Sequence, residues 1–145
     1  MGMGGKVSVS SAGYSGTPLA KKLGIKPDFN MAVIDAPNNY LELFDDLPGD
    51  LTIANEISSA HDLIHLFVKD RDGYLSRLPR LKDQIKQNGM VWVSWPKKAS
   101  KIVTDITEDI IRNEALKNGL VDVKVCAVDE VWSGLKLVIR LKDRV

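Results

Sequence analysis

Three short and almost uninterrupted apolar runs restrict the fold of this chain more than any other feature. They occupy residues 31–34, 63–68 and 90–95. Runs of four to six residues are too short for typical helices, and apolar residues on both sides of a strand are typical of a sheet that is covered on both faces. We therefore expect three buried, neighbouring strands, with the 61–69 segment central because it is the most strand-like.

Helical spacing precedes and follows the first run. Thr17 as N-cap and Pro18 in the first turn predict a short helix that ends at Gly24. Apolar residues at helical spacing over 40–47 predict a second helix covering the first strand, ended by the Pro-Gly pair at 48–49.

The longest helical pattern covers residues 74–85. We expect Pro79 to kink or restart this helix, since proline removes one backbone hydrogen bond, and Gly89 to end it. The strand at 90–95 then follows, halted by Pro96.

The last third of the chain predicts one helix and a hairpin. Thr104 or Asp105 is expected to cap a helix that ends at 118–119. Its predicted buried face consists of Val103, Ile106, Ile110 and Leu116. Segments 120–128 and 131–141 read as strands separated by only two residues, which is the spacing of an antiparallel hairpin.

A strand at 51–54 is separated from the central run by only six residues, 55–60. Six extended residues reach roughly 20 Å, enough to cross beneath one neighbouring strand without a helix. We prefer this parallel crossover, and a local antiparallel pairing of 51–54 is the alternative.

Charge and cysteine content narrow the environment and the partners. The 145 residues carry a formal charge of +1, so no global field favours nucleic acid, and we do not expect nucleic acid binding. Cys126 is the single cysteine and is expected to be a small buried apolar side chain in its strand. Without an apolar run that could span a bilayer or a signal sequence, we expect a cytoplasmic protein and no membrane partner.

Three features of the chain resemble class I S-adenosylmethionine-dependent methyltransferases. Residues 81–93 (LKDQIKQNGMVWV) are similar to their helix, glycine turn and strand, and 62–64 (DLI) to the start of their fourth strand. The terminal hairpin also resembles their final strand pair. This resemblance implies a reduced Rossmann-like fold.

Three further strings resemble an uncharacterised bacterial family of unknown function. They are 13–18 (GYSGTP), 94–98 (SWPKK) and 123–134 (VKVCAVDEVWSG). We expect a flexible lead-in over residues 1–13 and one domain over 14–145. Its fold class is α/β, a three-layer sandwich whose mostly parallel, reduced Rossmann-like sheet ends in an antiparallel hairpin.

The resemblance to methyltransferases fails at the cofactor site. Their loop after the first strand is rich in glycine, whereas residues 35–39 (DAPNN) contain none, and Pro37 also lacks an amide donor. The segment 55–60 leaves no room for an adenine-binding unit, although Glu56 lies where an acidic ribose partner would be sought. We therefore predict no cofactor, and S-adenosylmethionine in particular is not expected.

Candidate site residues follow from a rule of open parallel sheets, in which ligands bind beyond the carboxyl ends of the strands. The rule, extended to the hairpin tip, selects polar and aromatic side chains as ligand-binding candidates, with Asp70 beside them. The candidates are Asp35, Asn38, Asn39, Lys69, Ser94, Trp95, Lys97, Lys98, Asp129 and Trp132. No catalytic residue is assigned.

Each candidate also has a structural interpretation. Trp95 with the lysines at 97, 98 and 101 is a pattern that can stack a base and hold phosphate, but such a charge run is more often a solvated loop. Asp35 is an alternative turn or helix cap. His65 is expected to be a buried, hydrogen-bonded histidine and His61 to face solvent; the two are too far apart along the strand to share a metal, so no metal is predicted.

Three functions remain open on the sequence alone. The leading hypothesis is a noncatalytic small-ligand-binding or regulatory module that keeps the crevice and has lost the cofactor loop. The alternatives are a small enzyme that holds a nucleotide or other anion between Asp35 and residues 94–98, and a protein-interaction domain that exposes an edge strand or the tip at Trp132. A homo-oligomer is compatible with each of them.

Overall fold

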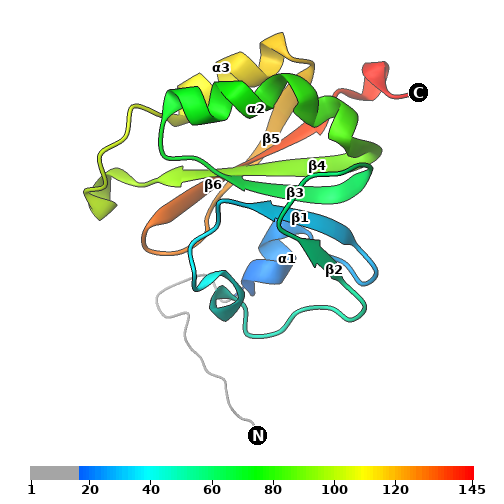
Figure 1. The fold of residues 1–145 in the computed structure, drawn as a ribbon, viewed down its shortest axis with the longest axis horizontal. Coiled ribbons are helices and arrows are strands. Elements are labelled where there is room, and N and C mark those ends of the chain that lie inside the picture. Colours follow the sequence, from blue (N-terminus) through cyan, green and yellow to red (C-terminus); the bar gives the residue numbers. More distant parts are fainter. Residues whose placement is uncertain (1–16) are drawn as a thin grey trace, which may run out of the picture.

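A computed structural model describes residues 17–145, in which six strands form one sheet of order β2-β1-β3-β4-β6-β5 (Figure 1). The expected lead-in at 1–13 lies outside the described residues. The strands are β1 (Asn30–Ile34), β2 (Thr52–Ala54), β3 (His61–Phe67), β4 (Ile85–Pro96), β5 (Leu120–Ala127) and β6 (Trp132–Ile139). The α-helices are α1 (Leu19–Leu23), α2 (Arg71–Gln84) and α3 (Glu108–Lys117).

Strand pairing confirms the predicted mostly parallel sheet with a reversed end. β2, β1, β3 and β4 run parallel, with Met31 opposite Ile53 on one side and Leu63 on the other. β6 is antiparallel to β4, and β5 is antiparallel to β6. The six residues between β2 and β3 therefore form the parallel crossover, and the antiparallel alternative for 51–54 is wrong.

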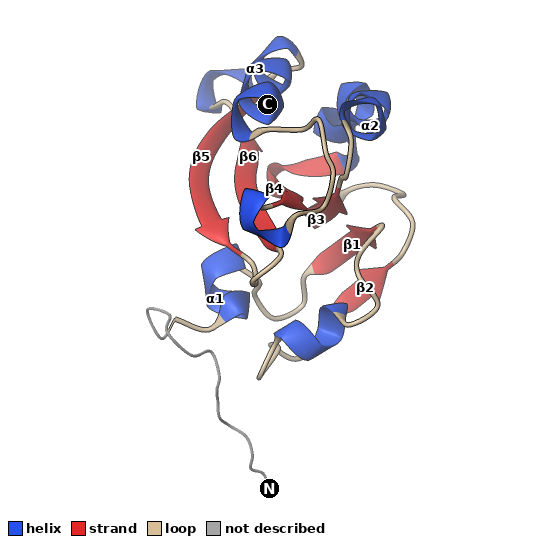
Figure 2. Cartoon of the chain, turned by 90° about the vertical axis from the view of Figure 1, so that its left-hand side faces the viewer, coloured by secondary structure: helices blue, strands red, loops and turns tan. Residues whose placement is uncertain are grey.

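The sheet separates two apolar layers, as predicted for a three-layer sandwich (Figure 2). One face carries α2 and α3, and we call it the α2/α3 face; it buries Ile64, Val91 and Leu135. The opposite face, which we call the α1 face, is covered by α1 and by the 3₁₀ helix Tyr40–Leu43, and it buries Leu63 and Trp92. Alternation of side chains along each strand distributes them between these layers.

The predicted helix over 40–47 is wrong beyond its first turn. Only Tyr40–Leu43 is helical, with 3₁₀ geometry, and Leu41 is 59% exposed. Tyr40, Leu43, Phe44 and Leu47 instead pack on the α1 face. The three-residue steps from 40 to 43 and from 44 to 47 match a 3₁₀ turn, whereas an α-helical face would have included Leu41.

Helix α2 continues through Pro79 and ends at Gln84, so β4 begins five residues earlier than expected. Gly89 lies inside β4 and is not the helix stop. A Cβ at Gly89 would lie 2.9 Å from the carbonyl oxygen of His61, next to an irregularity in the pairing of β3 with β4. The glycine is thus required for the close approach of two strands.

Helix α3 begins later than predicted, because Thr107 caps it by accepting a hydrogen bond from the Ile110 amide. The two expected caps hold the loop after β3 instead: Thr104 Oγ1 donates to the Lys69 carbonyl, and Asp105 accepts from the Arg71 amide. The predicted buried face also fails for Val103 and Leu116, which are 95% and 43% exposed. The helix residues buried against the sheet are Ile111 and Ala115, and its end at 118–119 is as expected.

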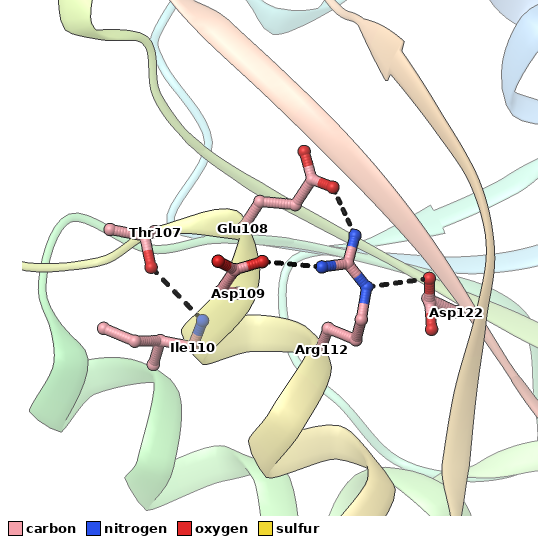
Figure 3. A network of polar contacts seen from close by, with 6 residues as sticks. All are labelled: Thr107, Glu108, Asp109, Ile110, Arg112 and Asp122. Carbon is pink, nitrogen blue, oxygen red and sulfur yellow. Dashed lines mark hydrogen bonds and ion pairs between the residues drawn. The ribbon is translucent and has the colours of Figure 1, made fainter.

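Arg112 fastens α3 to β5 (Figure 3). Its guanidinium donates to Asp122 of β5 at 3.0 Å, to Asp109 at 2.8 Å, and to Glu108. Hydrogen bonds to Asp122 and Glu108 raise the pKa of Arg112 above its ordinary value. The acidic first turn of α3 is therefore already paired with a cation.

The helices of the described part of the chain fall short of what a membrane span requires in length and apolar character.

Candidate functional site

A crevice opens where β1 and β3 end, and we call it the switch-point crevice. The chain leaves β1 toward the α1 face and leaves β3 into α2 on the α2/α3 face, so these two neighbouring strands feed connections on opposite sides of the sheet. Such a reversal leaves a gap between loops at the carboxyl ends of the strands. The crevice holds about 350 Å³ and is lined by Asp35, Ala36, Leu66, Phe67, Val68, Lys69, Asp70, Gly73 and Trp132.

Asp35 occupies the position directly after β1 and has φ +57°, in the left-handed region that favours glycine. The loop thus makes the tight turn that a glycine would make, but carries a carboxylate there. Asp35 and Ala36 also line a second hollow of about 500 Å³, together with Tyr40, Ile53 and Asn55. The loop after β1 therefore separates two adjoining cavities.

Charged side chains in the switch-point crevice differ in how they are used. Within residues 17–145, the side chains of Asp35 and Lys69 form no hydrogen bond or ion pair. The Asp70 side chain caps α2 by accepting from the Gly73 amide at 2.6 Å, and Asp105 accepts from the Arg71 amide at 2.7 Å. Two carboxylates thus already compensate the N-terminus of α2, which leaves Lys69 as the cation available to an anion.

Aromatic rings form the floor of the crevice. The rings of Phe67 and Trp132 meet edge-to-face with centroids 5.0 Å apart. Phe67 also stacks on the His65 ring, with ring centroids 4.3 Å apart. An aromatic floor beneath charged groups offers a ligand both apolar contact and electrostatic contact.

Beneath this floor a buried hydrogen-bonded chain through His65 connects the 3₁₀ helix Tyr40–Leu43 with β4. Its Nδ1 lies 2.9 Å from the Tyr40 hydroxyl and its Nε2 lies 2.8 Å from the Ser94 hydroxyl. Burial lowers the pKa of His65 to about 3 and raises that of Tyr40, so both are neutral near pH 7. The prediction of a buried, satisfied histidine is confirmed, and Ser94 is its partner rather than an accessible ligand group.

His61 is buried, so the prediction that it faces solvent is wrong. Its Nε2 accepts from the Ser58 amide at 3.0 Å, and its Nδ1 lies 3.2 Å from the Asn30 side-chain oxygen. Burial lowers the pKa of His61, while Asn30 and Asp62 partly offset this effect. Over residues 17–145, no three His, Cys, Asp or Glu side chains gather in a way that could hold a metal ion.

The structure divides the remaining predicted residues among several places. Trp95 is buried in the layer of the α2/α3 face and, with Lys98 and Lys101, lines a separate hollow of about 590 Å³. Asn38 and Asn39 are exposed and lie outside the lining of the switch-point crevice. Lys97 donates its backbone amide to the Val131 carbonyl.

The hairpin tip has a structural role. The Asp129 carboxylate accepts from the amides of Val131 and Trp132 at 2.8 Å each, which holds the turn. Trp132 is only 5% exposed, so the expected exposed tip at this residue is wrong. Cys126 is half-buried against the α1 face, and burial raises its pKa despite Lys22, Lys124 and Lys97.

The prediction from the sequence missed five of the crevice-lining residues, Ala36, Leu66, Phe67, Val68 and Gly73. The rule of strand carboxyl ends would have selected Phe67, because it is the last residue of β3. Gly73 lies in the first turn of α2, and only the true start of that helix would have identified it. Asp105 reaches the amide of Arg71, at the start of α2, from a loop 34 residues further along the chain, which no local pattern indicates.

Comparison with solved structures defines the class of fold as Rossmann-like, of the class I methyltransferase type. A ribosomal protein L11 methylase from Lactobacillus delbrueckii subsp. bulgaricus is 12% identical, with 84% of this chain and 75% of that chain covered and a TM-score of 0.57. A TehB-like SAM-dependent methyltransferase from Corynebacterium glutamicum is 10% identical, with 84% of this chain and 85% of that chain covered and a TM-score of 0.54. The fibrillarin pre-rRNA processing protein of Methanococcus jannaschii is 10% identical, with 83% of this chain and 73% of that chain covered and a TM-score of 0.54. At such identities the likeness shows the fold alone.

Within this class the chain belongs to the family described as protein of unknown function (DUF3052), whose model matches residues 35–141. The resemblance expected from the sequence strings is thereby confirmed. No curated protein matches the chain.

Proposed function

We propose that this protein is a noncatalytic small-ligand-binding or regulatory module that binds its ligand in the switch-point crevice. The observation that carries the proposal is the pair of unpartnered charges, Asp35 and Lys69, above the floor formed by Phe67 and Trp132. Opposite charges beside an aromatic surface suit a small molecule that carries both an anionic group, for Lys69, and a donor or cationic group, for Asp35.

The absence of a catalytic role is supported by the groups around the crevice. His65, the ionisable group beneath the floor, is covered by Phe67 and already hydrogen-bonded to Tyr40 and Ser94. A general base must reach the proton that it abstracts, and a fully buried ring does not. The remaining ionisable groups that line the crevice are Asp35, Lys69 and Asp70, of which Asp70 serves as a helix cap.

We also propose that S-adenosylmethionine is not the ligand. Every residue from 35 to 39 carries a Cβ, and Pro37 lacks an amide hydrogen, so the loop after β1 lacks the glycines with which that family approaches its cofactor. β2 is an edge strand of three residues, and no strand beyond it provides a further wall in residues 17–145. A cytoplasmic location forms part of the proposal, since the sequence carries one cysteine.

The two alternative functions have less support. An enzyme that holds a nucleotide between Asp35 and residues 94–98 needs these residues together, whereas Asp35 and Lys98 line different cavities. For the protein-interaction domain, the surface still available is the outer edge strand β5, where Val123 and Val125 are each 53% exposed. A register shift next to Val123 disrupts that edge, as bulges that discourage strand addition do.

A thermal-shift and calorimetry panel tests the proposal with free amino acids, nucleotides and S-adenosylmethionine as probes. A ligand present at about 100 times its dissociation constant stabilises the native state by about 2.7 kcal/mol. We expect at least one zwitterionic or anionic probe to raise the melting temperature, and Lys69→Gln and Asp35→Asn each to remove that shift.

Lys98→Gln is the matched control, because it makes the same charge change in a different cavity and should leave the shift intact. Micromolar binding of S-adenosylmethionine, or methyl transfer from it, would overturn the noncatalytic proposal. A panel without any response from the wild-type protein would also count against it.

A further inference from the structure

We propose a second ligand site, separate from the switch-point crevice, that binds a small multiply charged oxyanion between α2 and the crossover from β2 to β3. A groove of about 350 Å³ lies there, lined by Ile34, Asn55, Glu56, Ile57, Arg77, Arg80 and Gln84. None of these residues lines the switch-point crevice.

The groove exists because the crossover at residues 55–60 contains no helix. On the α2/α3 face Ile57 from this crossover packs against the apolar layer, and Ile34 at the end of β1 is buried beside it. The flank of α2 that points toward β2 is thereby left uncovered. An apolar floor of two isoleucines then lies below the polar side chains of the helix.

Helix periodicity brings the polar side chains together. Arg77, Arg80 and Gln84 follow one another at steps of three and four residues, so they share one face of α2. Asn55 and Glu56 approach from the end of β2. Two guanidinium groups and two amide side chains therefore converge on one groove, with Glu56 as the single acidic side chain among its lining residues.

The two arginines are free, unlike three others in residues 17–145. Arg112 and Arg140 form ion pairs, and Arg144 donates to the carbonyl of Ile139. In the part of the chain that the structure describes, Arg77 and Arg80 form neither a hydrogen bond nor an ion pair. Guanidinium groups bind carboxylate and phosphate oxygens in bidentate fashion, and their attraction to an anion is stronger over an apolar floor than in open water.

This arrangement selects the ligand chemistry. A single monovalent anion would satisfy one guanidinium, whereas pyrophosphate, a nucleoside diphosphate or a tricarboxylate can contact both. Phosphate and carboxylate oxygens share the geometry that arginine recognises, so the class is a small oxyanion with at least two charged groups. Asn55 and Gln84 supply further amide donors.

Calorimetric titration of the full chain with inorganic pyrophosphate and, in a second arm, with citrate tests this site. We expect one of the two to bind at millimolar concentration or below, which also identifies the preferred oxyanion. Arg77→Ala and Arg80→Ala should each weaken binding about tenfold or more, the loss expected for a charge-assisted hydrogen bond. Glu56→Gln should strengthen binding, because it removes the one opposing charge.

Arg71→Ala is the control, since Arg71 lies on the same helix but outside the groove. Equal weakening by Arg71→Ala would reveal nonspecific attraction and overturn the proposal, as would no binding of either probe. Circular dichroism of each variant checks that the fold is intact. Asp35→Asn and Lys69→Gln should not affect this site, so its failure is distinguishable from failure of the switch-point crevice.

Discussion

The two faces of the sheet are stabilised in different ways. Under α2 and α3 the strands contribute only apolar side chains to the buried layer, such as Ile64, Leu66 and Val93. On the α1 face the same strands bury His65 and Ser94, which are hydrogen-bonded to each other. The first layer resembles an ordinary core, while the second carries a polar chain directly under the floor of the switch-point crevice. The α2/α3 face therefore contributes mainly to stability, and the α1 face to the geometry of the crevice.

The largest expected effect is on the apolar layer. Leu81→Ala removes a fully buried α2 side chain and should lower the free energy of unfolding by about 2–5 kcal/mol, from lost burial and the cavity that remains. Within residues 17–145, neither histidine is hydrogen-bonded to a side chain of this layer, so the loss should be equal at pH 7 and pH 5. Urea denaturation at both values measures it. A penalty that changes with pH would break the distinction between the faces.

Acidification should act on the other face through His65. Its folded pKa of about 3 lies below the ordinary 6.5, so the unfolded chain binds the proton first, and stability is present above pH 6.5 and lost as pH falls. At pH 5 the loss amounts to about 2 kcal/mol relative to pH 7. His65→Gln abolishes this proton uptake, so the variant should show a smaller difference in unfolding free energy between pH 7 and pH 5. If the wild type and His65→Gln lost the same unfolding free energy between pH 7 and pH 5, the pKa of His65 would not be lowered in the folded protein.

Truncating the two partners of His65 tests the polar chain itself. Ser94→Ala and Tyr40→Phe each leave one ring nitrogen without its partner, and each should cost about 1–3 kcal/mol. Because both hydroxyls bind one imidazole, the double variant should depart from additivity by about 0.5 kcal/mol or more. Strict additivity in a double-mutant cycle would mean that Tyr40 and Ser94 act separately.

The smallest effect is expected at a partly exposed ion pair between β3 and β4. The Lys86 ammonium lies 3.0 Å from the Asp62 carboxylate, and the Lys86 side chain is 48% exposed. Lys86→Gln should therefore change the free energy of unfolding by no more than about 1 kcal/mol, and added salt should reduce the difference further. A larger, salt-independent loss would show that charges contribute to the core as the polar chain does.

Much of the fold was predictable because the signals for it are local. The buried strands, the parallel crossover and the hairpin followed from run lengths and from the short connection at 55–60, and the structure confirms them. The errors lie at helix boundaries. Thr104 and Asp105 look like caps but bond to the loop after β3, so a long-range contact outweighed a local preference.

The candidate site was only partly predictable. Asp35, Lys69 and Trp132 do line one crevice, as the carboxyl-end rule indicated. Ser94 and Trp95 end a neighbouring strand but point into the two opposite buried layers, since successive strand residues alternate between faces. The groove at Arg77 and Arg80 depends on what a helixless crossover leaves uncovered, and sequence spacing alone does not reveal this.

At Asp35, whose backbone is left-handed, the residue that best stabilises the fold differs from the residue that the proposed ligand needs. A residue with a side chain costs roughly 1 kcal/mol there, and glycine would adopt the same angles without that cost. Asp35→Gly would thus relax the turn after β1 while deleting the carboxylate. Selection of variants for thermal stability alone should enrich glycine at this position, whereas selection for ligand binding should keep the acid.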